Sequence, residues 1–328
     1  MTYSSGGLIQ ATDYNGFVAN TVGANVNGIW GAGSTDSGYG QSSLATVSAA
    51  GTVSATQWAS LVNTVSSMGS HQGTTITART APVAGNTISI LANLNTDLTN
   101  LTTNRGNAAA SGAQFTGWTG TSSKTTPTGA GGDFAWFITF THTITWASAA
   151  AARYFFNAGG RIKWETSKTA DVTAADTEWN DLANTLVGDI YITGGTGTQT
   201  IAGTAYTGTT KIGGTGSPNT LLTTTGWYDL TTSETVIYQQ YADTAPYTGQ
   251  FIRLGAYTAG SGTQLVLRTV WLDPGGSGAG SSDNISGGTA TTGITFGTAP
   301  ATVVTYFPPA TTHLTNTWGT PTVAATTA

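Results

Sequence analysis

The spacing of apolar residues divides the chain into two parts. Before about residue 105 they recur at helical intervals, whereas from about Ala113 onward they alternate with the period of two that is typical of strands. The first part also contains no lysine. We therefore predict a helical docking module over residues 1–110 and a separate β-rich domain over residues 111–328.

Three helices are predicted in the first part. The clearest begins with a capping box, in which Ser54 is the N-cap and Gln57 follows three residues later, and it should end at Gly69. The other two are indicated by apolar stripes at helical spacing. The three helices are expected over residues 13–26, 55–68 and 87–103, which is enough for a small bundle.

The second part is predicted to be mainly antiparallel β, with one or two short helices. The helices are expected over residues 148–157, capped by Ser148, and 174–187. Apolar alternation between turn residues indicates strands over residues 134–146, 161–165, 188–193, 198–206, 209–212, 235–241, 250–257, 264–272, 289–296 and 301–307. The fold class is therefore α+β, with a helical module followed by a sandwich-like domain.

Three segments are predicted to lack regular structure. Residues 29–41 are too rich in glycine for a helix or a strand, and we expect a structured loop there. Residues 274–283 are rich in Gly and Ser and resemble a linker or long loop. The Thr/Ala-rich tail after Pro309 is expected to lie over a neighbouring molecule.

The charge of the chain excludes several classes of partner. Only 8% of its 328 residues are charged, against about a quarter in an average domain, and the net charge is −5. Such a chain offers no basic surface for nucleic acid or anionic lipid, and it has no apolar run that could insert into a membrane. The first ten residues lack the pattern of a secretory signal, so we expect synthesis in a cytosol without export by that route.

Few residues are suited to catalysis or metal binding. There is no cysteine, and the three histidines, His71, His142 and His313, are not at metal-ligand spacing. His142 alternates with apolar neighbours and is interpreted as a structural strand residue. No serine-nucleophile or phosphate-loop motif is present. We therefore predict no catalytic residue, no cofactor and no metal site.

One segment, residues 153–189, is dense in charge, and two interpretations are open. Paired carboxylates can cleave a glycosidic bond, which would make the chain an enzyme acting on surface polysaccharide. The candidates would be Glu165, Asp171, Asp176, Glu178 and Asp181. The structural interpretation is favoured, because Asp176 and Glu178 would lie at a helix N-terminus and Asp181 would share their solvent-facing side.

Aromatic residues beside Thr- and Gly-rich segments are the other candidates for contacts. They are suited to stacking on sugars or to filling a subunit interface, and a place in the core or in an interface is favoured. The residues concerned are Trp118, Trp227, Tyr228, Tyr238 and Tyr241. Ten tryptophans in so weakly charged a chain further suggest that copies associate and bury them between subunits.

Several clusters of aromatic residues and glycines resemble virion structural proteins of tailed bacteriophages, particularly those of cyanobacteria and marine bacteria. The resemblance covers about half of the chain, and shared order and spacing make it moderately specific. It lies in Asp13-Tyr14-Asn15-Gly16-Phe17, in residues 30–41, in Thr56-Gln57-Trp58, in His71-Gln72-Gly73-Thr74 and in residues 153–162.

The resemblance implies a tail, baseplate or tail-fibre component, located in the virion after assembly in the host cytoplasm. The expected partners are copies of the chain and other virion proteins, with a host surface glycan as a further candidate. The alternative is a receptor- or carbohydrate-binding module of a tail fibre. The resemblance brings no catalytic residues to this chain.

Overall fold

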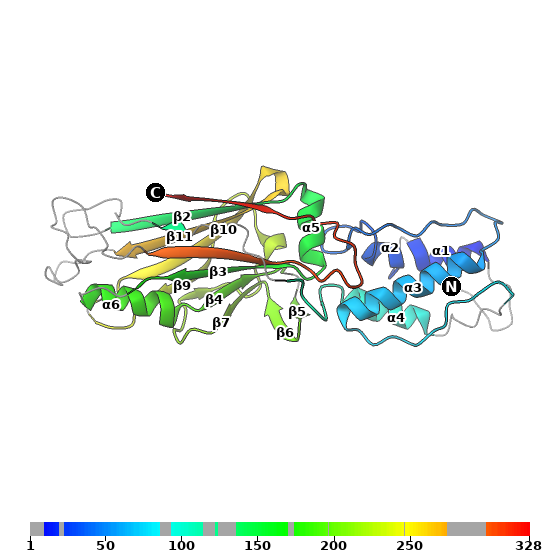
Figure 1. The fold of residues 1–328 in the computed structure, drawn as a ribbon, viewed down its shortest axis with the longest axis horizontal. Coiled ribbons are helices and arrows are strands. Elements are labelled where there is room, and N and C mark those ends of the chain that lie inside the picture. Colours follow the sequence, from blue (N-terminus) through cyan, green and yellow to red (C-terminus); the bar gives the residue numbers. More distant parts are fainter. Residues whose placement is uncertain are drawn as a thin grey trace.

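The molecule is elongated, with a group of helices at one end and, at the other, the strands with further helices packed beside them (Figure 1). The computed structural model describes residues 10–19, 23–85, 93–113, 122–123, 136–169, 174–195, 197–245, 247–273 and 300–328. The fold is α+β with a mainly antiparallel β domain, as predicted. Within the described residues, no helix is both long and apolar enough to cross a membrane.

The described residues of the helical module form four helices. They are α1 (Ala11–Ala19), α2 (Val26–Ile29), α3 (Ala55–Gln72) and α4 (Leu94–Thr103). The capping box predicted for α3 is confirmed, because the Ser54 and Gln57 side chains each bond to the other's backbone N–H. Trp58 of α3 is fully buried, and its ring lies edge-on to Tyr14 of α1, 5.2 Å between centroids.

Two helix boundaries in the module differ from the prediction. Helix α3 continues past Gly69 and ends at Gly73, which adopts the left-handed conformation with φ of 68°. The helix predicted over residues 13–26 is two helices, α1 and α2, and residues 20–22 between them lie outside the described residues. Residues 86–92, which include the start of the third predicted helix, lie outside them too.

The β domain is a sandwich of two main antiparallel sheets. The first has the order β1–β12–β3–β4–β7, and the second the order β13–β2–β11–β10–β9–β8. Strands of the first are β1 (Ser122–Ser123), β3 (Arg161–Ser167), β4 (Asp189–Ile192), β7 (Thr209–Ile212) and β12 (Ala301–Phe307). Strands of the second are β2 (Trp136–Thr145), β8 (Thr220–Leu221), β9 (Thr235–Tyr241), β10 (Phe251–Ala259), β11 (Gln264–Asp273) and β13 (Thr322–Thr327).

The two sheets share one apolar core with a few buried polar contacts. Trp164 of β3 donates its indole N–H to Thr269 of β11 at 2.9 Å. His142 of β2 is fully buried, and its Nε2 lies 2.7 Å from the Thr302 hydroxyl of β12. This contact agrees with the structural role predicted for His142. Burial lowers the pKa of His142 to about 4.

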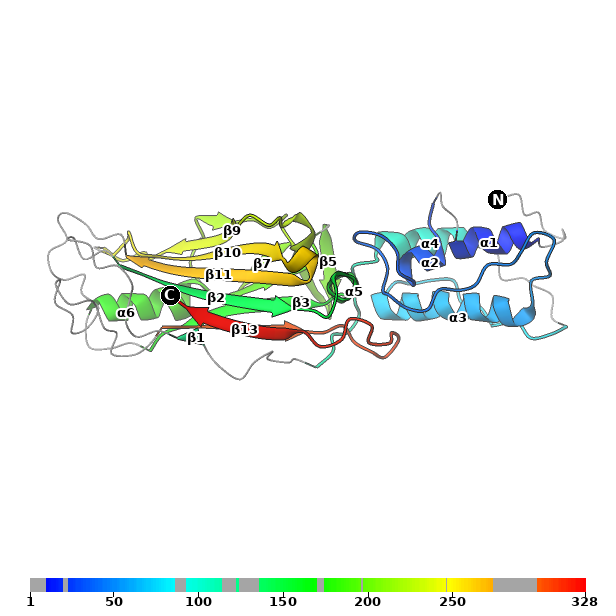
Figure 2. The same ribbon diagram turned by 90° about the horizontal axis from the view of Figure 1, so that it is seen from above.

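Two helices cover opposite ends of the sandwich (Figures 1 and 2). Helix α5 (Ala149–Asn157) follows the predicted Ser148 cap and faces the helical module. Helix α6 (Ala174–Asp181) lies at the far end and continues into a π-helical turn over Leu182–Leu186. Trp179 of α6 is buried and stacks on Trp271 of β11, 5.4 Å between ring centroids.

The other strand predictions are mostly confirmed, with one correction. The segment 198–206 is a hairpin of β5 (Thr198–Ile201) and β6 (Thr204–Thr207), because Ala202 and Gly203 both take positive φ and turn the chain. Residues 274–299, which include the predicted linker and the strand 289–296, lie outside the described residues.

The tail after Pro309 folds back on its own chain, contrary to the prediction that it lies over a neighbour. Leu314 and Trp318 are buried, and the chain then forms β13, which pairs with β2.

The prediction that tryptophans are buried between subunits is also corrected. Seven of the eight whose side chains are described are buried within the single chain: Trp58, Trp146, Trp164, Trp179, Trp227, Trp271 and Trp318. They therefore give no argument for a subunit interface.

Candidate functional site

The junction between the helical module and the sandwich is formed around a glycine-rich loop, residues 30–41, here called the junction loop. The loop folds back on itself through backbone bonds, including Gly40 N–H to Gly31 C=O at 2.9 Å. Gly33 and Gly38 have φ of 52° and 96°, and a Cβ on either would collide with backbone atoms across the loop. The structured loop predicted from the glycine content is confirmed, and these two positions require glycine.

Helix α5 of the sandwich supplies donors to the carbonyls of the junction loop. Arg153 donates its Nε–H to Thr35 C=O at 3.1 Å and an Nη–H to Ala32 C=O at 2.5 Å. Asn157, which is buried, donates to Gly38 C=O at 3.0 Å. Because Thr35 itself has a left-handed φ of 48°, these bonds stabilise a backbone conformation that is unfavourable for threonine.

Tyr228 of the sandwich also contacts both the junction loop and α5. Its hydroxyl lies 2.5 Å from Asn157 Oδ1 and 2.9 Å from Thr35 C=O. Burial raises the pKa of Tyr228, so the hydroxyl keeps its proton as a donor. Across the loop, the ring of Tyr154 lies where a Cβ on Gly40 would stand. The junction loop and α5 are thus in direct contact without space for larger side chains.

The end of α3 contacts the sandwich and the loop at the same place. His71 Nε2 lies 3.1 Å from Ala158 C=O, just after α5, and its ring is edge-on to Tyr39 of the loop. The neutral ring must carry its proton on Nε2 to donate here. Burial lowers the pKa of His71 to about 4, which keeps it neutral near pH 7.

The tail and the segment just after α4 also contact the junction loop. Gln41 exchanges two hydrogen bonds with the backbone of Thr315, at 2.8 and 2.9 Å. The Tyr39 hydroxyl donates to Arg105 C=O at 2.7 Å, and Arg105 forms an ion pair with Asp36. Segments that are nearly 280 residues apart in sequence are therefore held together at this loop.

This arrangement can fix the orientation of the two parts. One cluster of buried apolar residues runs from Tyr14 in the module to Trp271 in the sandwich. Beneath α5, Phe156 stacks on Trp227 at 5.3 Å and packs beside Trp146 at 5.5 Å. A continuous core together with specific backbone contacts is typical of a rigid connection.

The predicted contact residues occupy different environments. Trp227 is 8% exposed and Tyr238 is fully buried, with its hydroxyl 3.2 Å from Val187 C=O. Neither presents an open ring face, so the sugar-stacking role predicted for them does not fit this structure. Tyr228 belongs to the junction within the chain, Tyr241 is partly exposed beside Phe251, and Trp118 lies outside the described residues.

The carboxylates considered for polysaccharide cleavage fall into two groups. Glu165 accepts a bond from Lys163 at 2.8 Å, and Asp189 lies 3.7 Å from the same amine. Glu178 and Asp181 instead face Asp243, a residue that sequence patterns did not single out. Asp171 and the side chain of Asp176 lie outside the described residues. Glu178 is also buried, contrary to its predicted place on a solvent-facing helix surface.

Comparisons of the chain with protein-family models, with curated proteins and with solved structures gave no match. The resemblance to phage virion proteins therefore stays a prediction from sequence motifs. What the structure adds is the position of those motifs. Residues 30–41 and 153–162, which carry two of the longest stretches of the resemblance, meet at the junction.

Proposed function

We propose that this chain is a structural component of a tailed-phage virion, in the tail, baseplate or fibre, and that it associates with copies of itself and with other virion proteins. The observation that carries the proposal is the contact between the two resembling stretches. Arg153 and Asn157 of one bind the carbonyls of Ala32, Thr35 and Gly38 of the other. Motifs that pack together form one structural unit, as expected if the resemblance reflects a common architecture.

In this role the helical module attaches the chain to the particle and the sandwich extends away from it. The junction sets the direction in which the sandwich extends, because the core and the loop contacts connect both parts. A rigid connection allows repeated copies to adopt one geometry, which a symmetric assembly requires. The two ends of the elongated molecule are then available to different neighbours.

Association with copies and neighbours is supported by the scarcity of charge. Interface cores are depleted in Lys, Glu and Asp, and only 8% of this chain is charged. Contacts between surfaces of this kind need little desolvation of ionised groups. We therefore expect virion assembly to bury mainly Thr, Ser and Asn side chains together with backbone, including that of Gly.

The proposal is tested on particles and on the purified chain. Mass spectrometry of gradient-purified particles from a lysate that contains the protein should detect the chain at a fixed ratio to the other virion proteins. Light scattering of the purified chain should give a mass above that of the 33.3 kDa monomer. Absence from the particles together with a monomeric mass would reject the proposal.

A further inference from the structure

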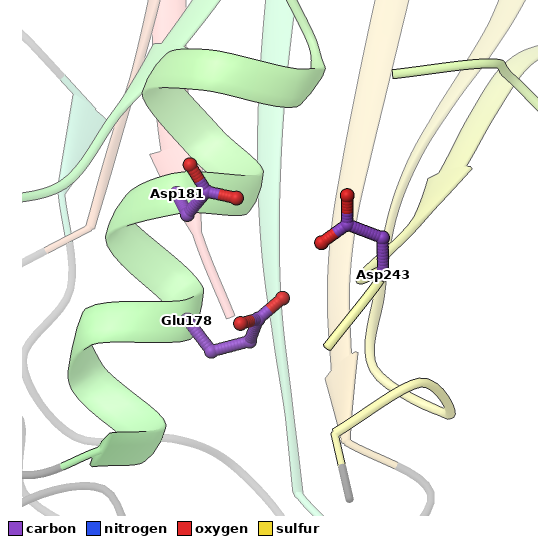
Figure 3. A group of neighbouring side chains, drawn as sticks. All are labelled: Glu178, Asp181 and Asp243. Carbon is purple, nitrogen blue, oxygen red and sulfur yellow. The ribbon is translucent and has the colours of Figure 1, made fainter. Parts of the chain in front are cut away.

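Three carboxylates from two segments converge at the end of the sandwich remote from the helical module (Figure 3). Glu178 and Asp181 are one helical turn apart on α6, and Asp243 lies between β9 and β10. One oxygen of each lies within 4.8 Å of the others. Calcium binds oxygen ligands at about 2.3–2.6 Å, so ligands on opposite sides of one ion are about 5 Å apart. The spacing allows all three groups to share one ion.

Glu178 provides a second observation, because it is buried without full hydrogen bonding. Its residue is only 6% exposed, and its Oε1 atom has no hydrogen-bond partner. The side chain points toward Asp243 (Figure 3). Burial raises the pKa of Glu178, hydrogen bonds from Thr244 oppose this, and the charges of Asp243 and Asp181 raise it further. A buried carboxylate oxygen that lacks a donor is unfavourable unless a positive charge compensates it.

The protein itself supplies no such charge in the part of the chain that the structure describes. Within that part, no ion pair joins Glu178, Asp181 or Asp243 to a basic side chain. In the helical module, by contrast, the buried carboxylate of Asp97 is paired with Arg79 at 2.6 Å. The three carboxylates therefore concentrate negative charge beside the buried side chain of Glu178.

We propose that Glu178, Asp181 and Asp243 bind one calcium ion. The ligands are all carboxylate oxygens, which suit hard cations rather than zinc or copper. Calcium takes roughly six to eight oxygen ligands in proteins. Asp181 is partly exposed and Asp243 is exposed, so water can supply the remaining ligands. Bound calcium would connect α6 to the segment between β9 and β10. This proposal does not depend on the proposed virion role.

The test uses the full chain after treatment with a chelator. Calorimetric titration with calcium chloride should show one saturable site with a Kd of ~10⁻⁴–10⁻³ M, the range of weak extracellular sites. Calcium should also raise the melting temperature. Terbium is a spectroscopic substitute, and Trp179, next to Glu178 in α6, should sensitise its emission, which calcium then displaces.

Variants locate the site. Glu178→Gln keeps the shape of the side chain and should abolish calcium binding, and Asp243→Asn, at an exposed position, should raise the Kd at least tenfold. Glu234→Gln, which removes a carboxylate from a surface pair with Arg268, is the matched control and should bind as the unmodified chain does. If Glu178→Gln does not fold, calcium binding by Asp243→Asn tests the proposal instead.

Several results would overturn the proposal. One is the absence of saturable binding by the folded chain up to about 10 mM calcium, ten times the weak end of the expected range. Another is calcium binding by Glu178→Gln or Asp243→Asn that equals that of the control. A third is a rise in melting temperature that magnesium also produces and that is the same in all variants, since such a rise marks general screening of charge.

Discussion

The junction and the acidic cluster both bring polar side chains against buried structure, but they differ in how these groups are partnered. At the junction, Arg153 and Asn157 donate to carbonyls of a loop more than a hundred residues away. At the cluster, three acceptors face one another and Glu178 Oε1 has no donor. Buried polar groups are normally satisfied. The satisfied set therefore holds the shape of the chain, whereas the unsatisfied set is the basis of the proposed calcium site.

The largest effect is expected from Gly38→Ala in the junction loop. A Cβ there would collide with the Ala32 carbonyl, in addition to the strain of a φ of 96°. We expect a loss of more than about 3 kcal/mol in the free energy of unfolding, measured by urea denaturation.

Gly85→Ala is the matched control, because Gly85 has a similar φ of 90° but no atom of the described residues lies within 4 Å of the added Cβ. This variant should lose only about 1–2 kcal/mol, from backbone strain alone. Equal losses in the two variants would show that the close packing of the junction loop contributes nothing.

Acid should weaken the junction and the sandwich through one histidine each. Burial lowers the pKa of His71 and of His142 to about 4, below the 6.5 of the unfolded chain. The unfolded chain then binds more protons, so stability is complete above pH 6.5, falls as the pH decreases and levels off below pH 4.

The expected loss is on the order of 3 kcal/mol per histidine at the acid end. The free energy of unfolding, measured by urea denaturation, should therefore differ less between pH 7 and pH 4.5 in His71→Gln and in His142→Gln than in the unmodified chain. A difference that neither substitution reduces would contradict the buried, neutral state of both rings.

Removing one donor from the junction should have a moderate effect. Asn157→Ala leaves Gly38 C=O without its bond and Tyr228 without one of its partners, so we expect a loss of about 1–3 kcal/mol. Asn95→Ala, at an exposed position on α4, should change stability by less than about 0.5 kcal/mol. Thermal and urea denaturation measure the loss of stability in both variants. Similar losses would show that the hydrogen bonds of Asn157 contribute no more than an exposed side chain does.

The smallest effect is expected at the acidic cluster in the absence of calcium. Asp243→Asn removes a like charge near Glu178 and breaks no ion pair among the described residues, so stability should stay within about 0.5 kcal/mol of the unmodified chain or rise. Denaturation after chelator treatment measures this. A loss as large as that of Asn157→Ala would mean that the cluster is a structural contact like the junction.

Local signals in the sequence predicted most of the secondary structure. The Ser54–Gln57 box and the Ser148 cap place two helix starts, because capping depends on residues within one turn. The end of α3 was misplaced, since Gly69 and Gly73 are both suitable stops and packing of His71 against Ala158 extends the helix to the second. Tertiary contact decides between two local signals of equal strength.

The sites were much less predictable, because their members are distant in sequence. The charged residues of α6 were expected to face solvent, but Trp179 stacks on Trp271 and Glu178 is buried beside Thr244. Asp243 is an exposed acid in a connection, with no local pattern to link it to α6. The neutral tail likewise has no charge pattern that predicts pairing of β13 with β2.

The central claim is that the junction holds the helical module and the sandwich in one orientation, and spin-label distance measurement tests it most directly. The chain has no cysteine, so cysteines introduced at two exposed positions, Ser66 on α3 and Thr204 on β6, are the only sites that take the spin label. Pulsed electron paramagnetic resonance should give a single narrow distance distribution, and Gly38→Ala should broaden it. A broad or multiple distribution in the otherwise unmodified chain would contradict a fixed junction.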